Sequence, residues 1–249
     1  MNIVGRSSRA ALSPHYIFES VPAVQVQQAL REVFTNWGRP QALRVDNGPP
    51  WGSQKDLPSA LTLWLVGLEI NVIHNRPYRP EDNSKIERAH GVVKGWIDPQ
   101  SCRDFETLKT LLDRATRLQR EAYPSCSGRT RLQTYPALAK RAKAYHSDLE
   151  STLWHFPLVL QFLAQHRWPR TVSKTGQISL YNRNYSVGRP FAGQIVSVRF
   201  DAQLREWVIE NTQGQIVRRQ PFKEFDAHRV QTMQITHRKP SRIKSTAGA

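Results

Sequence analysis

Several features that define other protein classes are scarce in this sequence of 249 residues. It contains only two cysteines, Cys102 and Cys126, and neither has metal-ligand partners at a useful spacing, so we expect reduced thiols. The longest apolar run, from Leu61 to Leu68, is interrupted by a threonine and a glycine and is too short to span a bilayer. The Met1 end lacks a charged and then apolar leader. We therefore expect no secretory signal and a cytoplasmic protein.

Acidic residues are also scarce. The sequence has 20 aspartates and glutamates against 36 lysines and arginines, which gives a formal net charge of +16. Such an excess favours a polyanionic partner, and nucleic acid is the first candidate. A basic membrane-surface protein is the alternative, but no amphipathic helix has a clean lysine and arginine face. The length permits two small domains or one large one, and a hydrophobic content of 39% is enough for a core.

Two carboxylates stand in a stretch where short apolar strands alternate with loops and helices. Residues 43–45 are typical of a strand, which ends on Asp46 before an Asn-Gly dipeptide that tolerates the positive φ of a sharp turn. Residues 71–74 form a second apolar strand, and a proline-rich loop then leads into a helix that begins near Ser84. Glu87 lies in the first turn of that helix. We expect the two acids to converge at one edge of a sheet, where they can share divalent cations.

Each acid alone has a simpler interpretation. An aspartate before Asn-Gly usually bonds its own backbone in a turn, and Asp46 fits that description. Ser84 and Glu87 have the spacing of a capping box, in which the glutamate returns a hydrogen bond to the start of the helix. The order of the two acids, with this loop and this helix between them, favours a shared site.

The combined pattern of V-D-N-G-P and H-N-x-P-Y-x-P-x-D-N-x-x-x-E-R resembles the DDE transposases and retroviral-type integrases, and insertion-sequence transposases in particular. Glu87 lies 41 positions after Asp46, close to the usual spacing of the second and third acids in insertion-sequence transposases. The resemblance implies a ribonuclease-H-like α/β core in which Asp46 and Glu87 are catalytic residues and ligands of Mg²⁺ or Mn²⁺. It also implies that Lys94 and Arg88 contact DNA, that the partners are transposon ends and target DNA, and that a homo-oligomer assembles on the DNA. The reaction would be in-line attack on a DNA phosphodiester by water and then by a 3′-hydroxyl.

The same resemblance implies an earlier catalytic aspartate on an opening strand, but no aspartate occurs before Asp46. Glu19, the last acid before the first helix, which is expected at residues 22–37, lies on the wrong strand for that role. We therefore expect an N-terminally truncated core without its first strand, in which the Asp46 strand has an unpaired edge. Two acids hold a pair of Mg²⁺ ions poorly, so enzymatic activity stays open. The alternative function is an inactive DNA-binding remnant that competes or assembles with an intact transposase.

Four regions are expected along the chain: a truncated catalytic core at residues 1–98, a basic helical linker at 99–170, a small closed all-β barrel at 171–222 and a basic disordered tail at 223–249. The barrel pattern resembles the C-terminal barrel of phage Mu-type transposases, and we assign Trp207 to its core. A prokaryotic, nucleoid-associated protein is implied by the insertion-sequence resemblance. RNA binding is a weaker alternative, because no RNP-type aromatic strand motif is present. Further cations expected on the DNA backbone are Arg129, Arg131, Arg238, Lys239 and Arg242.

Overall fold

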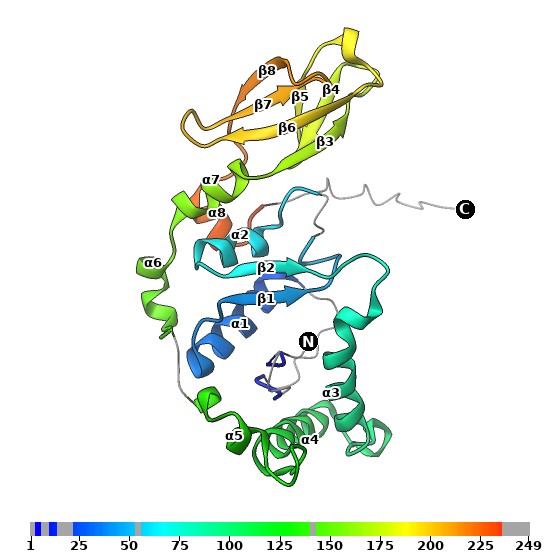
Figure 1. Ribbon diagram of the computed structural model, residues 1–249, viewed down its shortest axis with the longest axis vertical. Helices are drawn as coiled ribbons and strands as arrows, with labels where there is room; N and C mark the ends of the chain where they lie inside the picture. Colours follow the sequence, from blue (N-terminus) through cyan, green and yellow to red (C-terminus); the bar gives the residue numbers. More distant parts are fainter. Residues whose placement is uncertain (1–2, 6–9, 14–21, 53–55, 140–142, 236–249) are drawn as a thin grey trace, which may run out of the picture. The chain divides into compact units, whose positions relative to one another are not determined.

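The computed structural model describes residues 3–5, 10–13, 22–52, 56–139 and 143–235 (Figure 1). It divides into two compact units, each made of two separate stretches of chain. The first unit comprises Met1–Asp46 and Ile73–Leu153, and the second comprises Asn47–Val72 and Trp154–Ala249. These bounds differ from the four expected regions, because residues 47–72 group with the C-terminal half rather than with the core.

The first unit is built around α1 (Ala23–Trp37), which confirms the helix expected in this part of the chain. Its apolar residues recur at helical spacing, so they line one face, and that face is buried. The helix ends at Gly38, whose φ of 80° suits glycine, and Pro40 follows shortly after. The buried apolar residues of this face are Val26, Ala29, Leu30, Val33 and Phe34.

Two strands of the expected α/β layer are confirmed. β1 (Ala42–Val45) pairs with β2 (Asn71–His74) in a two-stranded sheet, and the arrows of both strands point the same way in Figure 1. The Asn75 backbone N–H extends this pairing by donating to the Val45 carbonyl at 2.9 Å. Among the described residues no further strand joins this sheet.

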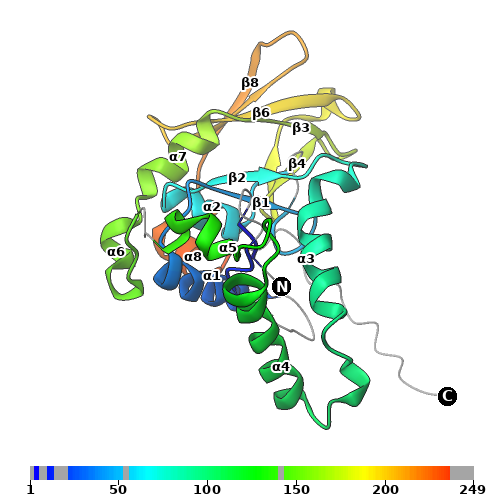
Figure 2. The same ribbon diagram turned by 60° about the horizontal axis from the view of Figure 1, so that its bottom comes forward.

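A helical hairpin follows the sheet. A 3-10 turn, η1 (Pro80–Asn83), runs directly into α3 (Ser84–Lys94), and a second turn, η2 (Pro99–Ser101), leads to α4 (Phe105–Arg117). Asp104 caps α4 by accepting from the Thr107 N–H at 2.7 Å. Figure 2 shows that α4 turns back from α3, so that the two helices form a V.

The end of α4 holds an early segment of the chain in place. The helix continues as a π-turn, η3 (Leu118–Ala122), whose buried Gln119 accepts from the Ala11 N–H at 3.1 Å. Arg120 donates to the Ala11 carbonyl at 3.0 Å. Both backbone groups of Ala11 are thus satisfied by side chains rather than by a sheet neighbour.

The rest of the first unit consists of short helical turns. A buried carboxylate in these turns forms an ion pair with α1. The Glu150 side chain is 8% exposed, and Arg31 donates to both of its oxygens at 2.8 Å. The Tyr145 hydroxyl also donates to Glu150, and burial raises the tyrosine pKa. This fully bonded group ties the turns to α1. The turns are α5 (Arg131–Thr134), η4 (Pro136–Ala139), η5 (Ser147–Leu149) and α6 (Glu150–Leu153).

In the second unit, α2 (Ala60–Gly67) is buried on almost every side. Its sequence is apolar all round, which is typical of a helix enclosed by other elements. Ser59 caps it by accepting from the Thr62 N–H at 3.1 Å. The helix packs against α7 (Phe156–Ala164) and α8 (Ala227–Gln231). The helical linker expected up to residue 170 ends with α7 at Ala164, because a strand begins at Arg167.

The C-terminal strands form two antiparallel sheets. One contains four strands in the order β3 (Arg167–Thr171), β6 (Ile195–Asp201), β7 (Glu206–Glu210) and β8 (Ile216–Pro221). The other is a hairpin of β4 (Gln177–Leu180) and β5 (Arg183–Ser186), and η6 (Arg189–Phe191) follows it. The aromatic core predicted here is confirmed, since Trp207 is 0% exposed and meets the Phe200 ring edge-on at 5.3 Å.

The closed barrel predicted for residues 171–222 is wrong for the part of the chain that the structure describes. A barrel needs its outer strands to pair, whereas β3 and β8 remain the two edges of their sheet. The hairpin turns tightly at Tyr181 and Asn182, both with positive φ, and its two strands pair with each other.

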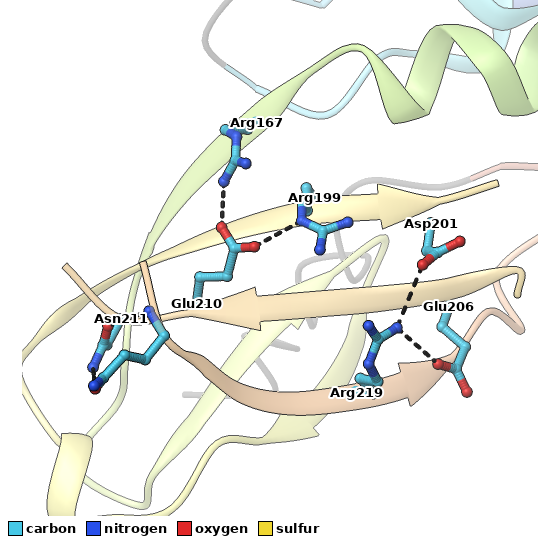
Figure 3. A network of polar contacts seen from close by, with 8 residues as sticks. Arg167, Arg199, Asp201, Glu206, Glu210, Asn211 and Arg219 are labelled. Carbon is cyan, nitrogen blue, oxygen red and sulfur yellow. Dashed lines mark hydrogen bonds and ion pairs between the residues drawn. The ribbon is translucent and has the colours of Figure 1, made fainter. Parts of the chain in front are cut away.

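One face of the four-stranded sheet carries two groups of ion pairs (Figure 3). Glu210 on β7 is bonded by Arg167 and by Arg199, the latter at 2.7 Å. Arg219 on β8 lies 3.4 Å from Asp201 and 3.5 Å from Glu206. Three arginines thus balance three carboxylates. This face contributes no net charge to the basic excess of the chain.

The first part of the basic disordered tail expected at residues 223–249 is folded. Glu224 and Phe225 are buried, α8 follows them, and Ile235 is only 7% exposed. The Trp207 indole donates to the Glu224 carboxylate at 3.0 Å, and the Tyr185 hydroxyl also donates to it. These contacts fold the segment up to residue 235. Residues 236–249 lie outside the described part.

Candidate metal and nucleic-acid site

Asp46 follows the last residue of β1, where the buried Val45 anchors the strand and the aspartate itself is exposed. Its Oδ1 accepts from the Asn75 Nδ2 at 2.6 Å. Asn75 is only 7% exposed, and its backbone also bonds to Val45. The carboxylate is therefore oriented by a side chain from the end of the neighbouring strand.

His74 lies at the last position of β2, directly before Asn75. It is half-buried, and this burial lowers its pKa, while a hydrogen bond to the Asp46 backbone acts in the opposite direction. The imidazole is thus neutral near pH 7.

Glu87 lies in the first turn of α3, as predicted, and is exposed. Ser84 does not form the capping box that its spacing from Glu87 suggested. Its hydroxyl donates to the Glu81 carbonyl of the preceding 3-10 turn at 2.8 Å, and its backbone continues that turn. His90 and Lys94 follow Glu87 by three and seven positions, which places all three on one helix face. Burial and Lys94 lower the His90 pKa, and Glu87 raises it.

The donor atoms of this site suit a hard cation, but they are few. Among the described residues, no three histidine, cysteine, aspartate or glutamate side chains gather in a group that could hold a metal ion. Asp46 and Glu87 belong to the same unit and supply carboxylate oxygens. Mg²⁺ is often bound by only one or two carboxylates, with waters and substrate phosphates completing its coordination. Two carboxylates therefore match in number the protein ligands of one such ion rather than those of a fully caged pair.

The cations expected to contact DNA fall into three groups. Arg88 and Lys94 are exposed on α3. Arg129 is exposed in the turn before α5, whereas Arg131 is half-buried and bonds to the Ser125 hydroxyl. The remaining three, Arg238, Lys239 and Arg242, lie outside the described residues.

Two residues of the H-N-x-P-Y-x-P-x-D-N motif that form bonds here, Asn75 and Asp82, received no role from the sequence. Asp82, in η1, bonds the backbone and the guanidinium of Arg76 and lies 3.3 Å from Arg44 on β1. The hydrogen bond from the Arg76 side chain is the main reason why the pKa of Asp82 falls to about 2. The only signal in the sequence was an acid surrounded by arginines, which is weak in so basic a chain.

Comparisons with known proteins suggest an integrase-like relationship. No protein family model matches the chain. A stretch of 86 residues, 34% of the chain, is 30% identical to the Intracisternal A-particle Pol-related polyprotein of Mouse intracisternal a-particle MIA14. A stretch of 70 residues, 28% of the chain, is 31% identical to the IgE-binding protein of Mus musculus. These stretches span only 9% and 12% of the two curated relatives.

Among solved structures, the chain is similar to a chain of the simian T-cell lymphotropic virus intasome, which was solved in complex with the PP2A regulatory subunit B56 gamma. The TM-score is 0.44 at 15% sequence identity, over 89% of this chain and 69% of that one. At this level the likeness assigns neither a fold nor a function. The expectation of a prokaryotic, nucleoid-associated protein gains no support from these comparisons. Within the described residues, every helix is too short or too polar to cross a membrane.

Proposed function

We propose that this chain is an integrase-like DNA-binding protein that cleaves and joins DNA strands with a divalent metal ion bound by Asp46 and Glu87. The observation that carries the proposal is a single motif folded within one unit. An exposed aspartate directly follows one strand, the asparagine that orients it directly follows the next strand, and the following helix carries an exposed glutamate in its first turn. The partial identity to a retroviral Pol-related polyprotein supports the same class.

The residues of this motif have distinct tasks in the proposed reaction. Asn75 fixes one oxygen of Asp46, so the carboxylate is oriented before any ligand arrives. When bound, Mg²⁺ or Mn²⁺ supplies stabilisation of the charge that develops on the phosphate oxygens and lowers the pKa of an attacking water. Lys94 and Arg88 present cations on the helix that carries Glu87, where they can hold the DNA backbone.

A second candidate function is DNA binding without catalysis. It is favoured by the finding that no third carboxylate or histidine completes a metal-binding group among the described residues. Two-metal phosphoryl transfer holds both ions close together, which two carboxylates do poorly. Such a protein would occupy DNA and compete or assemble with an intact transposase.

A nicking assay distinguishes the two functions. Supercoiled plasmid is incubated with the chain and Mn²⁺, and the conversion to open circles is measured. We expect nicking that is lost in Asp46→Asn and in Glu87→Gln, because each removes one ligand charge. Retarded migration of the DNA without nicking supports the second candidate.

The matched control is Glu81→Gln, which removes one negative charge from the turn just before α3. Glu81 is 66% exposed in its side chain, and its ion pair with Arg79 is long at 3.8 Å. Nicking should be unchanged in this variant. Equal nicking by the parent, Asp46→Asn and Glu87→Gln would contradict the proposal.

A further inference from the structure

Asp82 stands at the meeting point of three elements of the first unit. It lies in η1, directly before α3 and five residues before Glu87. Its Oδ2 accepts from the Arg76 backbone N–H at 3.0 Å and from the Arg76 Nε at 3.2 Å, and its Oδ1 accepts from the Arg76 Nη2 at 3.0 Å. The same Oδ2 lies 3.3 Å from the Arg44 Nη1 on β1.

These contacts close a ring of links around the candidate site. Arg44 and Asp46 are two positions apart on the chain that forms β1, so their side chains leave the same side of the strand. Asp46 accepts from Asn75, and Asn75 is joined covalently to Arg76. Arg76 binds Asp82, and Asp82 returns to Arg44. The start of α3 is thereby tied both to the strand that carries Asp46 and to the residue after its hydrogen-bond donor.

The burial pattern indicates that Asp82 is the centre of this ring. Its side chain is 10% exposed, whereas those of Arg44 and Arg76 are 32% and 67% exposed. One carboxylate therefore has two cationic partners from different elements, which is a stronger constraint than an isolated surface pair. With its pKa at about 2, Asp82 keeps its charge across the pH range in which metal binding is measured.

We propose that Asp82 is a positioning residue, which sets the start of α3, and with it Glu87, relative to Asp46 through its bonds to Arg44 and Arg76. The inference rests on the proposed function, because it concerns the alignment of the same two metal ligands. Asp82 itself does not bind the metal. Its role is to keep Glu87 at a fixed distance from the end of β1, so that one ion can reach both carboxylates.

The test measures Mn²⁺ binding to the full chain by calorimetry and by the electron paramagnetic resonance spectrum of the bound ion. We expect Asp82→Asn to lower the affinity at least about tenfold, as is typical when residues behind the metal ligands are removed. The spectrum should also change, because the ligand geometry changes. Glu81→Gln removes the same charge from the same turn and should leave both readings unchanged.

A second variant removes the partner of Asp82 that lies on β1. Arg44→Gln leaves Asp82 bonded to Arg76 and should also lower the Mn²⁺ affinity. The double variant Arg44→Gln with Asp82→Asn should lose no more affinity than Asp82→Asn alone, because both act through one contact. Asp82→Glu, which keeps the charge, should recover part of the loss. An affinity in Asp82→Asn equal to that of Glu81→Gln would overturn the proposal, and so would additive losses in the double variant.

A wrong assignment of the metal site can be distinguished from a wrong role for Asp82. If the parent binds no Mn²⁺, or binds it equally after Asp46→Asn, the metal site is wrong, and hydrogen exchange then tests the ring alone. In that case Asp82→Asn should speed exchange of the Arg76 amide and of the first-turn amides of α3, while Glu81→Gln should not. Equal exchange in the two variants would overturn the positioning role.

Discussion

Glu87, His90 and Lys94 form one face of α3, and the titration of His90 reports on the other two. Burial and the nearby Lys94 lower the His90 pKa, whereas Glu87 raises it. Opposite charges thus flank one imidazole at helical spacing. This makes His90 a probe of the charges on the surface that we assign to metal and DNA.

We expect Lys94→Gln to raise the His90 pKa and Glu87→Gln to lower it further, because each variant removes one of the two opposing charges. The pKa is measured by following the imidazole resonances of His90 in an NMR titration. Glu81→Gln serves as the control and should leave the His90 pKa in place. Shifts of the same sign in Lys94→Gln and Glu87→Gln would contradict the shared face.

Individual site residues differ in how far the sequence predicted them. Asp46 and Glu87 could be located because local signals, a strand before Asn-Gly and a helix start, fix their surroundings within a few positions. Asn75 and Asp82 could not, because their partners Asp46 and Arg44 are distant along the chain and meet them only after folding. Metal binding itself stays a prediction.

Among the elements, α2 shows most clearly how close packing restricts the sequence. The Trp154 side chain lies against Gly67 at the end of the helix, and its indole donates to the Trp64 carbonyl at 3.0 Å. A Cβ added to Gly67 would overlap this indole ring, with Cδ1 only 2.8 Å away. Gly67 is therefore required by the approach of the tryptophan rather than by its own backbone conformation.

Gly67→Ala should lower the free energy of unfolding by about 1–3 kcal/mol, the usual cost of overpacking a core. Gly91→Ala in α3 is the matched control, because a Cβ there meets nothing within 4 Å. That variant should instead gain about 1 kcal/mol from the higher helix propensity of alanine. Chemical denaturation measures both variants, and a neutral Gly67→Ala would contradict the packing described here.

Helices and strands were predicted well where the hydrophobic periodicity of the sequence is strong. The pairing of the strands into sheets was predicted poorly. The helix at Ala23–Trp37 and the strand at Asn71–His74 lie close to their predicted positions. The closed barrel was not found, because alternation along a strand identifies its buried face but not its neighbours. The folded segment up to residue 235 was missed, since its few apolar residues, such as Phe225 and Val230, are too widely spaced to show a period.

The whole chain combines a strong positive charge with a local balance of charge. The formal charge is +16, yet the sheet face with Glu210 and Arg219 pairs its arginines with carboxylates. The exposed cations that we propose for DNA contact, on α3 and at Arg129, lie outside this balanced face. Salt-dependent binding to DNA stays a prediction of this distribution.

Calorimetric titration with Mn²⁺ tests the central claim most directly, because it requires neither DNA nor catalysis. The parent should bind Mn²⁺ weakly, as expected for two carboxylates that leave several positions to water. Asp46→Asn and Glu87→Gln should each abolish the measurable heat of binding, while Glu81→Gln should keep it. Unchanged affinity in either of the first two variants would contradict the assignment of Asp46 and Glu87 as one metal site.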